Sequence, residues 1–533
     1  MTRILVVQLC RLGDILQTTP MLRGLRRIHP GAHVTLMVLD GFRHAPVPGR
    51  LYDELSVFPL DRLAASTEAD WRAALGEVRA FVATLGEQPY DLVLNLTGST
   101  LANLLCALLP SREVRGGLVA RDRTRVVRHP WMAYFWSSLV ARSYGAVNLV
   151  DLFRWVAEVP IDSAGLELEV PSEAHRSVEQ WLRGRGWSGA PLVALQLGAS
   201  DERKRWPPEQ FAAMADLLPE SAGPLMFVGS ASERPLVERA LARLRRPALN
   251  AAGETSVVEL AALLTRARLL VTNDTGTMHV ATAMGTRVLD LSTGPVFVHE
   301  TGPYAVGAIA VEPSISCFPC AAGSVCHHLS CRDDFTPADI AALGMFALGD
   351  GSMPKPPRAR VLRAARAATG RLEFRPLWDP AGDSHGAYRR MIARMWEATL
   401  PVPAAIDGAA GNDDVIAGVD GEVDRIVPAL DSFARRADRA AATARAIARA
   451  SANEQDIHAA ELERELERAL TSAVVEPLLQ PIAAYLRTRL ESTTERDVSA
   501  LVRVYQQEWA GAAARARFLA TALSRDKVGS ARS

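Results

Sequence analysis

The sequence predicts an α/β fold with two Rossmann-like domains that face a cleft, followed by an α-helical C-terminal extension. Three observations lead to this prediction. Apolar strand-like runs alternate with amphipathic helix-like segments, first near the N-terminus and again from about residue 190. The chain has 533 residues, which is more than one hydrophobic core usually supports. From about residue 423 the sequence becomes rich in Ala, Arg and Glu at helical spacing.

The first domain is expected over residues 1–165. Ile4–Leu9 is a continuous apolar run, typical of a parallel strand that is covered on both faces, and a polar loop at 11–14 follows it. The next elements are a helix and two strands, expected at Pro20–Arg27, His33–Leu39 and Tyr90–Asn95. Ligands of open parallel sheets bind beyond the carboxyl ends of the strands, so the loop at 11–14 is a candidate site segment.

The second domain is expected over residues 190–348, with the same alternation. Its strands are predicted at Leu192–Leu197, Pro224–Val228, Ala267–Thr272 and Arg287–Leu291. Its helices are predicted at Pro208–Leu218, Glu233–Leu244, Ser256–Thr265 and Met278–Met284. The simplest architecture is therefore two Rossmann-like halves joined by a linker near 165–190.

The character of the chain changes from about residue 349. Residues 349–422 are predicted to be a Pro/Gly-rich linker, including Pro401–Gly421, with a basic helix at Arg358–Arg371. Residues 423–533 are predicted to be helical, and Ile457–Leu470 has the apolar spacing of a helical hairpin or bundle. Two interpretations of the arginine-rich faces remain open: solvated helix surface, or contact with anionic lipid headgroups.

Composition excludes several classes of protein. Lys plus Arg and Asp plus Glu both number 60, so the formal net charge is zero and a dedicated nucleic-acid binder is not expected. The short apolar run at the start reads as a strand rather than a signal peptide. No stretch approaches the roughly 18 apolar residues of a membrane-spanning helix. We therefore expect a cytoplasmic protein, with peripheral contact at the inner face of the membrane as an open addition.

Four short polar or glycine-containing stretches carry the chemistry, and each adjoins an apolar run. They are Arg11–Asp14, Gly198–Ser200, Lys204–Pro207 and Asp274–His279. In an α/β fold such interruptions are where ligand loops occur. The first stretch supplies a carboxylate from the N-terminal domain, and the other three supply candidate phosphate binders from the second domain. This division predicts a site between the two domains.

With these motifs in this order, residues 1 to about 345 resemble glycosyltransferase family 9, the ADP-heptose:lipopolysaccharide heptosyltransferases. The matching stretches are Ile4–Pro20, Val193–Ser200 with Lys204–Pro207, Asn273–His279 and Thr301–Pro303. The resemblance implies a GT-B fold with the acceptor in the N-terminal domain and the donor in the second. It also implies transfer with inversion at the anomeric carbon and without a metal ion. The helical extension lies outside the resemblance.

Sugar transfer from a nucleotide diphosphate needs a base for the acceptor hydroxyl and stabilisation of the departing diphosphate. Asp14 is the candidate base, and the resemblance places the family's catalytic aspartate there; the alternative is a helix cap. Arg11 either holds an anionic acceptor or pairs with Asp14. Lys204 is the candidate cation for the diphosphate, with an ordinary surface lysine as the alternative.

The donor is expected to meet backbone N–H groups and hydroxyls of two turns. Gly198 and Ser200 form the first turn. Thr275, Gly276 and Thr277 form the second, which leads directly into a helix whose N-terminus favours an anion.

Three further side chains are candidate donor contacts. Asp274 is expected to bind donor hydroxyls, because two anions repel. His279 either reaches a phosphate or is a buried structural histidine. Glu233 is a ribose contact by the resemblance, or an ordinary glutamate of a first helical turn.

A cluster of four cysteines needs a separate explanation. Cys317, Cys320, Cys326 and Cys331 lie within fifteen residues. Four thiolates can close a tetrahedral zinc site, which suits a cytoplasmic protein better than disulfides. The alternatives are reduced or redox-labile thiols and an iron–sulfur cluster. A structural zinc site is therefore one of three open interpretations, and no cofactor is expected for the transfer itself.

The function predicted from the sequence is transfer of a heptose or related sugar from an ADP-type donor to a lipopolysaccharide core or similar surface glycan. Two alternatives remain open. The same groups can glycosylate a protein hydroxyl, or the chain can be a non-catalytic nucleotide-sugar-binding module. A nicotinamide dehydrogenase is disfavoured, because no Gly-x-Gly-x-x-Gly follows the first strand.

Overall fold

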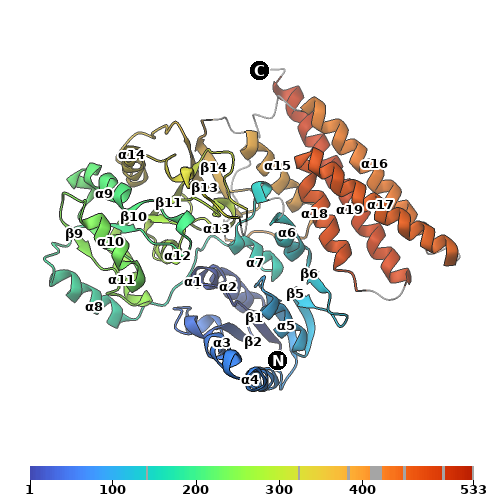
Figure 1. Ribbon diagram of the computed structural model, residues 1–533, viewed down its shortest axis with the longest axis horizontal. Coiled ribbons are helices and arrows are strands. Elements are labelled where there is room, and N and C mark those ends of the chain that lie inside the picture. The colour runs from blue at the N-terminus through green and yellow to red at the C-terminus, as the bar shows by residue number, and fades with distance from the viewer. Residues whose placement is uncertain are drawn as a thin grey trace.

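The computed structural model describes residues 1–139, 142–321, 324–380, 384–407, 423–447, 452–494 and 498–530. Figure 1 shows two α/β domains and a group of long helices. The N-terminal domain is blue, the second domain is green to yellow, and the C-terminal helices are orange to red. The predicted fold class, with two α/β domains and a helical extension, is confirmed.

The first domain is built on a six-stranded sheet with the order β3-β2-β1-β4-β5-β6. Its strands are β1 (Arg3–Val7), β2 (His33–Leu39), β3 (Glu54–Phe58), β4 (Tyr90–Asn95), β5 (Ser111–Val119) and β6 (Arg125–Arg128). β1 lies between β2 and β4 and is parallel to both. Residues 4–7 of β1 have no exposed surface. A strand covered on both faces is apolar throughout, which explains the continuous run in the sequence.

Helices cover both faces of this sheet. The loop that follows β1 lies at the boundary between the two domains. The helices are α1 (Leu12–Gln17), α2 (Thr19–Ile28), α3 (Leu60–Ala69), α4 (Trp71–Leu85), α5 (Thr100–Leu108), α6 (Pro130–Ser138) and α7 (Leu149–Val156). The helix expected at Pro20–Arg27 is α2, and the short α1 precedes it. All eight residues of α7 are buried, including Asp151 and Arg154. A buried helix that carries charges requires polar partners on its neighbours.

The second domain contains an eight-stranded sheet with the order β14-β13-β12-β11-β10-β7-β8-β9. Its strands are β7 (Leu192–Gln196), β8 (Leu225–Val228), β9 (Ala248–Asn250), β10 (Ala267–Asn273), β11 (Arg287–Leu291), β12 (Ile309–Pro313), β13 (Ala359–Arg366) and β14 (Leu372–Trp378). Its helices include α8 (Ser172–Arg183), α9 (Pro208–Leu217), α10 (Arg234–Leu241), α11 (Val257–Leu264), α12 (Gly276–Ala283), α13 (Val298–Thr301) and α14 (Pro337–Leu348). Each strand and helix predicted for residues 190–348 has a counterpart here.

The predicted basic helix at Arg358–Arg371 is wrong, because this segment contains strand β13 and the turn that leads into β14. β13 is antiparallel to β12, with Val361 opposite Val311. Pairing with the exposed edge of β12 decides the conformation, and it overrides the helical spacing of the arginines. The segment thus extends the second sheet instead of forming only a linker. Part of the predicted linker, residues 408–422, lies outside the described residues.

The C-terminal extension contains α15 (Ser384–Thr399), α16 (Val423–Ile447), α17 (Ala452–Val475), α18 (Gln480–Glu491) and α19 (Val498–Ser530). Buried alanines occur on α16 and on α19, among them Ala441 and Ala513. Small side chains allow helix axes to approach closely, and Figure 1 shows α16 and α19 side by side. Among the described residues, we find no helix with both the length and the apolar character that crossing a membrane requires.

The extension shares one hydrophobic core with the N-terminal domain. The rings of Trp396 on α15 and Tyr485 on α18 lie 4.9 Å apart, and Trp396 also contacts Tyr134 of α6. The Trp131 indole donates to the backbone oxygen of Pro401. The extension is therefore packed against the first domain while β13 and β14 belong to the second sheet.

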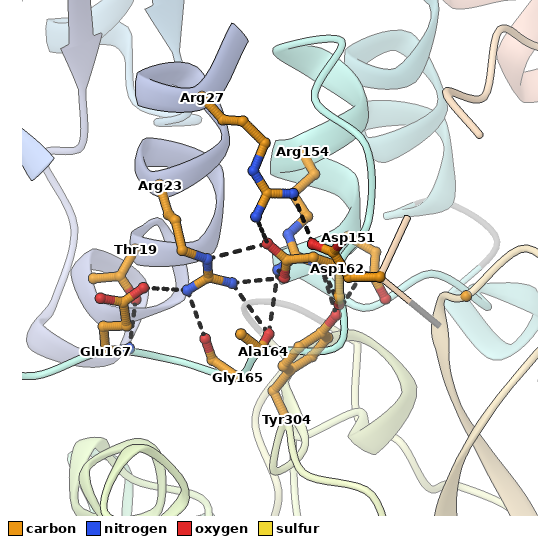
Figure 2. A network of polar contacts seen from close by, with 12 residues as sticks. Thr19, Arg23, Arg27, Asp151, Arg154, Asp162, Ala164, Gly165, Glu167 and Tyr304 are labelled. Atoms are coloured by element: carbon orange, nitrogen blue, oxygen red, sulfur yellow. Dashed lines mark hydrogen bonds and ion pairs between the residues drawn. The ribbon is translucent and has the colours of Figure 1, made fainter. Parts of the chain in front are cut away.

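A buried polar network joins the two domains around α7 (Figure 2). Asp162 accepts from Arg154 at 2.8 Å and from Arg23 of α2 at 2.7 Å. Asp151 accepts from the Tyr304 hydroxyl of the second domain at 2.5 Å and from the backbone N–H of Leu372 at 2.7 Å. Removing one partner from such a network leaves an uncompensated buried charge, at a cost of about 3–5 kcal/mol. The network therefore fixes the second domain and the β13–β14 turn against the first domain.

Candidate functional site

A cleft with a cavity volume of about 460 Å³ lies between the two domains, and the predicted stretches meet there. The predicted site residues that line it are Arg11, Asp14, Ser200, Lys204, Glu233, Asp274, Thr275, Gly276, Thr277 and His279. Gly198 lies beside the cleft, packed against Glu233. The structure thus brings together residues up to 268 positions apart in the sequence, as the predicted interdomain site requires.

Asp14 lies in the first turn of α1, half-buried at the cleft. Its Oδ2 accepts a hydrogen bond from the backbone N–H of Arg11 at 3.1 Å, so the carboxylate does cap the helix. Burial raises the pKa of Asp14, and the Asp274 carboxylate raises it further, while the Arg11 N–H and the cations of Arg11 and Lys204 act in the opposite direction. A carboxylate with a raised pKa is a stronger base than an ordinary aspartate.

Arg11 connects the two sides of the cleft. Its guanidinium donates to the hydroxyl of Ser200, which follows β7 in the second domain. The side chain of Arg11 is exposed, so a bound anion can compete for the same donors.

Lys204 is the cation of the donor side. Its Nζ lies 3.2 Å from Oδ1 of Asp274, and its side chain is 20% exposed. The other carboxylate oxygen of Asp274 accepts from the Thr301 hydroxyl at 2.9 Å. A lysine that is already held by a carboxylate beside a cleft differs from an ordinary surface lysine, because its charge is directed into the site.

The N-terminus of α12 points its backbone N–H groups into the same cleft. Thr275 is the N-cap residue, and its hydroxyl makes no capping hydrogen bond. Within the described part of the chain, this buried hydroxyl has no hydrogen-bond partner. An unsatisfied hydroxyl and free N–H groups at a helix N-terminus together favour an anionic ligand.

His279 is buried, with 4% of its surface exposed, and it sits where α12 meets α1. Its Nε2 is 3.3 Å from Nε2 of Gln17. Burial lowers the pKa of His279 to about 4, with the Lys204 charge as a smaller contribution, so the ring is neutral near pH 7. The position favours a structural histidine that can also offer one neutral N–H to a ligand.

The contact between α1 and α12 leaves no room for a side chain at Gly13. A Cβ atom there would lie 2.7 Å from Cδ2 of His279. We expect Gly13→Ala to lower the free energy of unfolding by about 1–3 kcal/mol, as overpacking does. Urea denaturation monitored by circular dichroism measures this change.

The matched control is Gly76→Ala in α4, where no atom lies within 4 Å of the added Cβ. Alanine is a better helix former than glycine, so this control is expected to gain about 0.5–1 kcal/mol. If Gly13→Ala gained stability as well, the close contact between the two helices would be refuted.

Glu233 takes part in a helix cap and also lines the cleft. Its Oε2 accepts from the backbone N–H of Ser230 at 2.7 Å, and its Oε1 accepts from Gln196 at 3.3 Å. A Cβ atom at Gly198 would lie only 1.7 Å from Oε1 of Glu233. Gly198 therefore provides the space in which Glu233 reaches the cleft. Both interpretations of Glu233 are compatible with this geometry.

Several lining residues were not predicted from the sequence. They are Gln17, Arg142, Gln196, Gly229, Ser230, Thr255, Ser256, Val257, Leu260, Pro295 and Val296. The lining also includes Leu12, Gly13, Ala199 and Thr301, which belong to stretches named from the sequence. Ser256 and Glu259 form a capping box at the start of α11, and this Ser-x-x-Glu pattern was a readable signal of a helix N-terminus. Arg142 had no such signal, because only the domain packing brings it to the cleft.

The predicted structural zinc site at the four cysteines is not supported. Among the described residues, no group of three or more His, Cys, Asp or Glu side chains is arranged to hold a metal ion. Cys317 is exposed, whereas Cys331 is buried, and the Cys326 sulfur accepts from the backbone N–H of Leu329 at 3.4 Å. The environments of these thiols differ, and burial together with the neighbouring Cys331, Cys326 and Cys317 raises the pKa of Cys320.

The cysteine loop instead supports the segment that carries Lys204. The Arg203 guanidinium donates to the backbone oxygen of Ser324 at 2.5 Å. The backbone N–H of Cys320 donates to Gly294, whose neighbour Thr293 donates through its hydroxyl to the backbone oxygen of Arg203. All four thiols are free, so this support relies on hydrogen bonds and packing.

Comparison with known proteins gives consistent matches. The profile of glycosyltransferase family 9 (heptosyltransferase) matches residues 78–326, a range that includes Lys204 and Asp274 but not Asp14. Lipopolysaccharide heptosyltransferase 1 of Pseudomonas aeruginosa is 27% identical over 332 residues, or 60% of this chain and 86% of that protein. Lipopolysaccharide heptosyltransferase 2 of Escherichia coli K12 is 27% identical over 315 residues, or 56% of this chain and 85% of that protein.

A solved structure shows the same fold. The crystal structure of a family 9 glycosyl transferase from Veillonella parvula covers 66% of this chain and 98% of its own, with 22% sequence identity and a TM-score of 0.55. The predicted α/β fold is therefore shared with that protein.

Proposed function

We propose that this chain is a glycosyltransferase of family 9 that transfers a heptose or related sugar from an ADP-type nucleotide-sugar donor to a lipopolysaccharide core or similar surface glycan. The family and the relatives identify the chain as a glycosyltransferase. The relatives named above are lipopolysaccharide heptosyltransferases, which supports the choice of sugar and acceptor.

One observation carries the proposal: a carboxylate from the first domain and a cation from the second face each other across one cleft. Asp14 contributes the carboxylate, and Lys204 contributes the cation beside the N-terminus of α12. This placement of the two charges suits a reaction in which the acceptor hydroxyl loses a proton at one side of the cleft while negative charge develops on a diphosphate at the other side.

In the proposed reaction, Asp14 takes the proton of the acceptor hydroxyl as its oxygen bonds to the anomeric carbon. The bond from that carbon to the diphosphate oxygen breaks on the opposite face, so the anomeric configuration inverts. Lys204 and the N–H groups at Thr275–Thr277 receive the negative charge of the leaving diphosphate. These groups supply the positive charge at that position, and we therefore propose transfer without a metal ion.

The donor-binding roles follow from the same geometry. The N-terminus of α12 and the buried hydroxyl of Thr275 are assigned to the diphosphate. Glu233 is assigned to the ribose, since a carboxylate accepts from vicinal hydroxyls. Asp274 is assigned to hydroxyls of the transferred sugar. On the other side, the exposed Arg11 is assigned to an anionic group of the acceptor.

The proposed acceptor is part of a membrane glycolipid, so the proposal includes a cytoplasmic enzyme with peripheral contact at the inner face of the membrane. The arginines of the extension are candidates for that contact, because anionic headgroups attract clustered basic side chains.

A donor screen tests the proposed function. The purified full-length chain is incubated with ADP-heptose or with UDP- and GDP-sugars, and with lipopolysaccharide lacking heptose as acceptor. We expect ADP release together with an acceptor mass increase of one heptose unit, at a rate that EDTA leaves unchanged. Transfer to protein alone, or no transfer with any donor, would reject the assignment.

A further inference from the structure

Arg142 is a residue of the first domain that reaches across to the second. It lies in a single turn of 3-10 helix at Arg142–Tyr144, and it lines the cleft. Its Nε and Nη2 both lie 3.0 Å from Oε2 of Glu300, and its Nη1 donates to the backbone oxygen of Pro295 at 2.8 Å. The Arg142 guanidinium thus binds both Pro295 and Glu300, which lie in the segment that includes α13.

Glu300 stands next to a residue of the donor site. It belongs to α13, a helix of four residues, and Thr301 follows it directly. The Thr301 hydroxyl donates to Oδ2 of Asp274, whose Oδ1 lies 3.2 Å from Nζ of Lys204. A continuous set of contacts therefore leads from the first domain through α13 to Lys204.

The ion pair between Arg142 and Glu300 is more than an ordinary surface pair. Glu300 is buried, with 5% of its surface exposed, and within the described residues its Oε1 has no hydrogen-bond partner. A buried carboxylate that is only partly satisfied contributes little to stability compared with an apolar residue of the same size. Stability alone does not account for a charge at this position, whereas an orienting role does.

We propose that Arg142 and Glu300 form an interdomain latch that positions Asp274 and Lys204 for the donor diphosphate. Both are positioning residues, because they act through Thr301 rather than on the substrate. The inference rests on the proposed function only where it assigns Lys204 to the diphosphate. The two partners belong to different domains, so the latch forms only when the domains are as close as they are here. The positions of Asp274 and Lys204 then depend on the distance between the two domains.

A second contact supports the latch from the same side. The Asn148 amide of the first domain donates to the backbone oxygen of Gly302 at 3.4 Å, just after α13. With Pro295 and Glu300 held by Arg142, the described residues give the segment 295–302 three hydrogen-bonded attachments to the first domain. Loss of Arg142 removes two of these three and allows α13 to move relative to Asp274.

The first test uses amide hydrogen exchange in the ligand-free full-length protein, so it needs no donor. Arg142→Met is expected to exchange at least about threefold faster over residues 274–277 and 295–302. Arg142→Lys keeps the positive charge but cannot donate to Glu300 and Pro295 at the same time as a planar guanidinium does. Its amide exchange rates are expected to lie between those of wild type and Arg142→Met. The matched control is Arg239→Met, which removes the exposed pair with Glu209 in the same domain as Lys204.

The second test is a double-mutant cycle measured by calorimetric titration with ADP. Thr301→Val keeps the shape of the side chain, breaks the last link of the relay and leaves no buried charge unpaired. We expect Arg142→Met and Thr301→Val each to weaken ADP binding about fivefold. The double variant is expected to match either single variant within about twofold, because both break one relay.

If the double variant lost ADP affinity about 25-fold, the two single losses would be independent and the latch would be overturned. The latch would also be overturned if Arg142→Met and Thr301→Val had the ADP affinity and the amide exchange rates of the control Arg239→Met. Failure of the proposed function looks different. In that case the wild type transfers no sugar from any donor, while the exchange rates of Arg142→Met still respond as expected.

Discussion

Asp14→Asn is expected to lower the rate of sugar transfer at least about 100-fold, the lower end of what a general base contributes. Asparagine has nearly the shape of aspartate and can still accept the backbone N–H of Arg11, so the turn at the start of α1 should persist. It cannot take a proton from the acceptor hydroxyl. Binding of ADP, measured by calorimetry, is expected to stay within about twofold of wild type, since the loss belongs to the chemical step.

The pH dependence of the wild type follows from the same side chain. Burial raises the pKa of Asp14 above the usual range of an aspartate. The base acts as the carboxylate, so the rate of transfer should fall as the pH is lowered through this raised pKa. The residual activity of Asp14→Asn should lack this acidic limb. A variant that transfers sugar at a nearly normal rate, or keeps the limb, would remove Asp14 from the role of base.

The stability of this variant should change in the opposite direction to its activity. A carboxylic acid whose pKa is raised by folding binds its proton more tightly in the folded than in the unfolded state. Its contribution to stability is therefore lost as the pH rises through the raised pKa. Above that pKa the wild type holds an ionised, partly buried carboxylate, which asparagine avoids. Thermal unfolding above that pKa is accordingly expected at a higher temperature for Asp14→Asn.

Lys204→Met is expected to lower kcat by about 100- to 1,000-fold, the range measured for losing one donor to a developing negative charge. Methionine retains the length of the side chain but leaves the diphosphate without its cation. It also leaves Asp274 with the Thr301 hydroxyl and without its ion pair, so a carboxylate next to the phosphates adds repulsion. Steady-state kinetics should therefore show a fall in kcat together with weaker binding of ADP.

The matched control is Lys355→Met. Lys355 lies over the ring of Trp378, a residue of β14, and does not line the cleft. Its replacement should leave kcat within about twofold of wild type. Equal kinetics for Lys204→Met and Lys355→Met would show that Lys204 is an ordinary surface lysine.

Much of the fold could be predicted because local patterns and tertiary packing agree. β1, β7 and β10 are covered on both faces, and their sequences are accordingly apolar almost throughout. The failure at Arg358–Arg371 has the opposite cause. Its arginines are spaced as on a helix face, but the exposed edge of β12 supplies hydrogen bonds that make β13 a strand. No local pattern reports the presence of such an edge.

The candidate site divides in the same way. Asp14, Lys204 and Asp274 belong to short motifs at the ends of strands, so their meeting in one cleft could be predicted. Arg142 could not, because only the packing of the two domains brings it to the cleft. Thr301 belongs to a stretch that the family resemblance includes, but its hydrogen bond to Asp274 could not be predicted. The cysteine spacing suggested zinc as one of three interpretations, and the described residues give it no support. The roles assigned to the site residues remain predictions that the variants above test.

The common core of the extension and the first domain has a practical consequence for protein engineering. A boundary placed near residue 348, where the family resemblance ends, would remove β13 and β14 from the second sheet and uncover Trp131 and Tyr134 of the first. The extension is therefore not an accessory tail, because its removal would also disrupt the second sheet and the core of the first domain. Expression designs, chimaeras and domain exchanges with shorter relatives should therefore keep the extension together with the first domain.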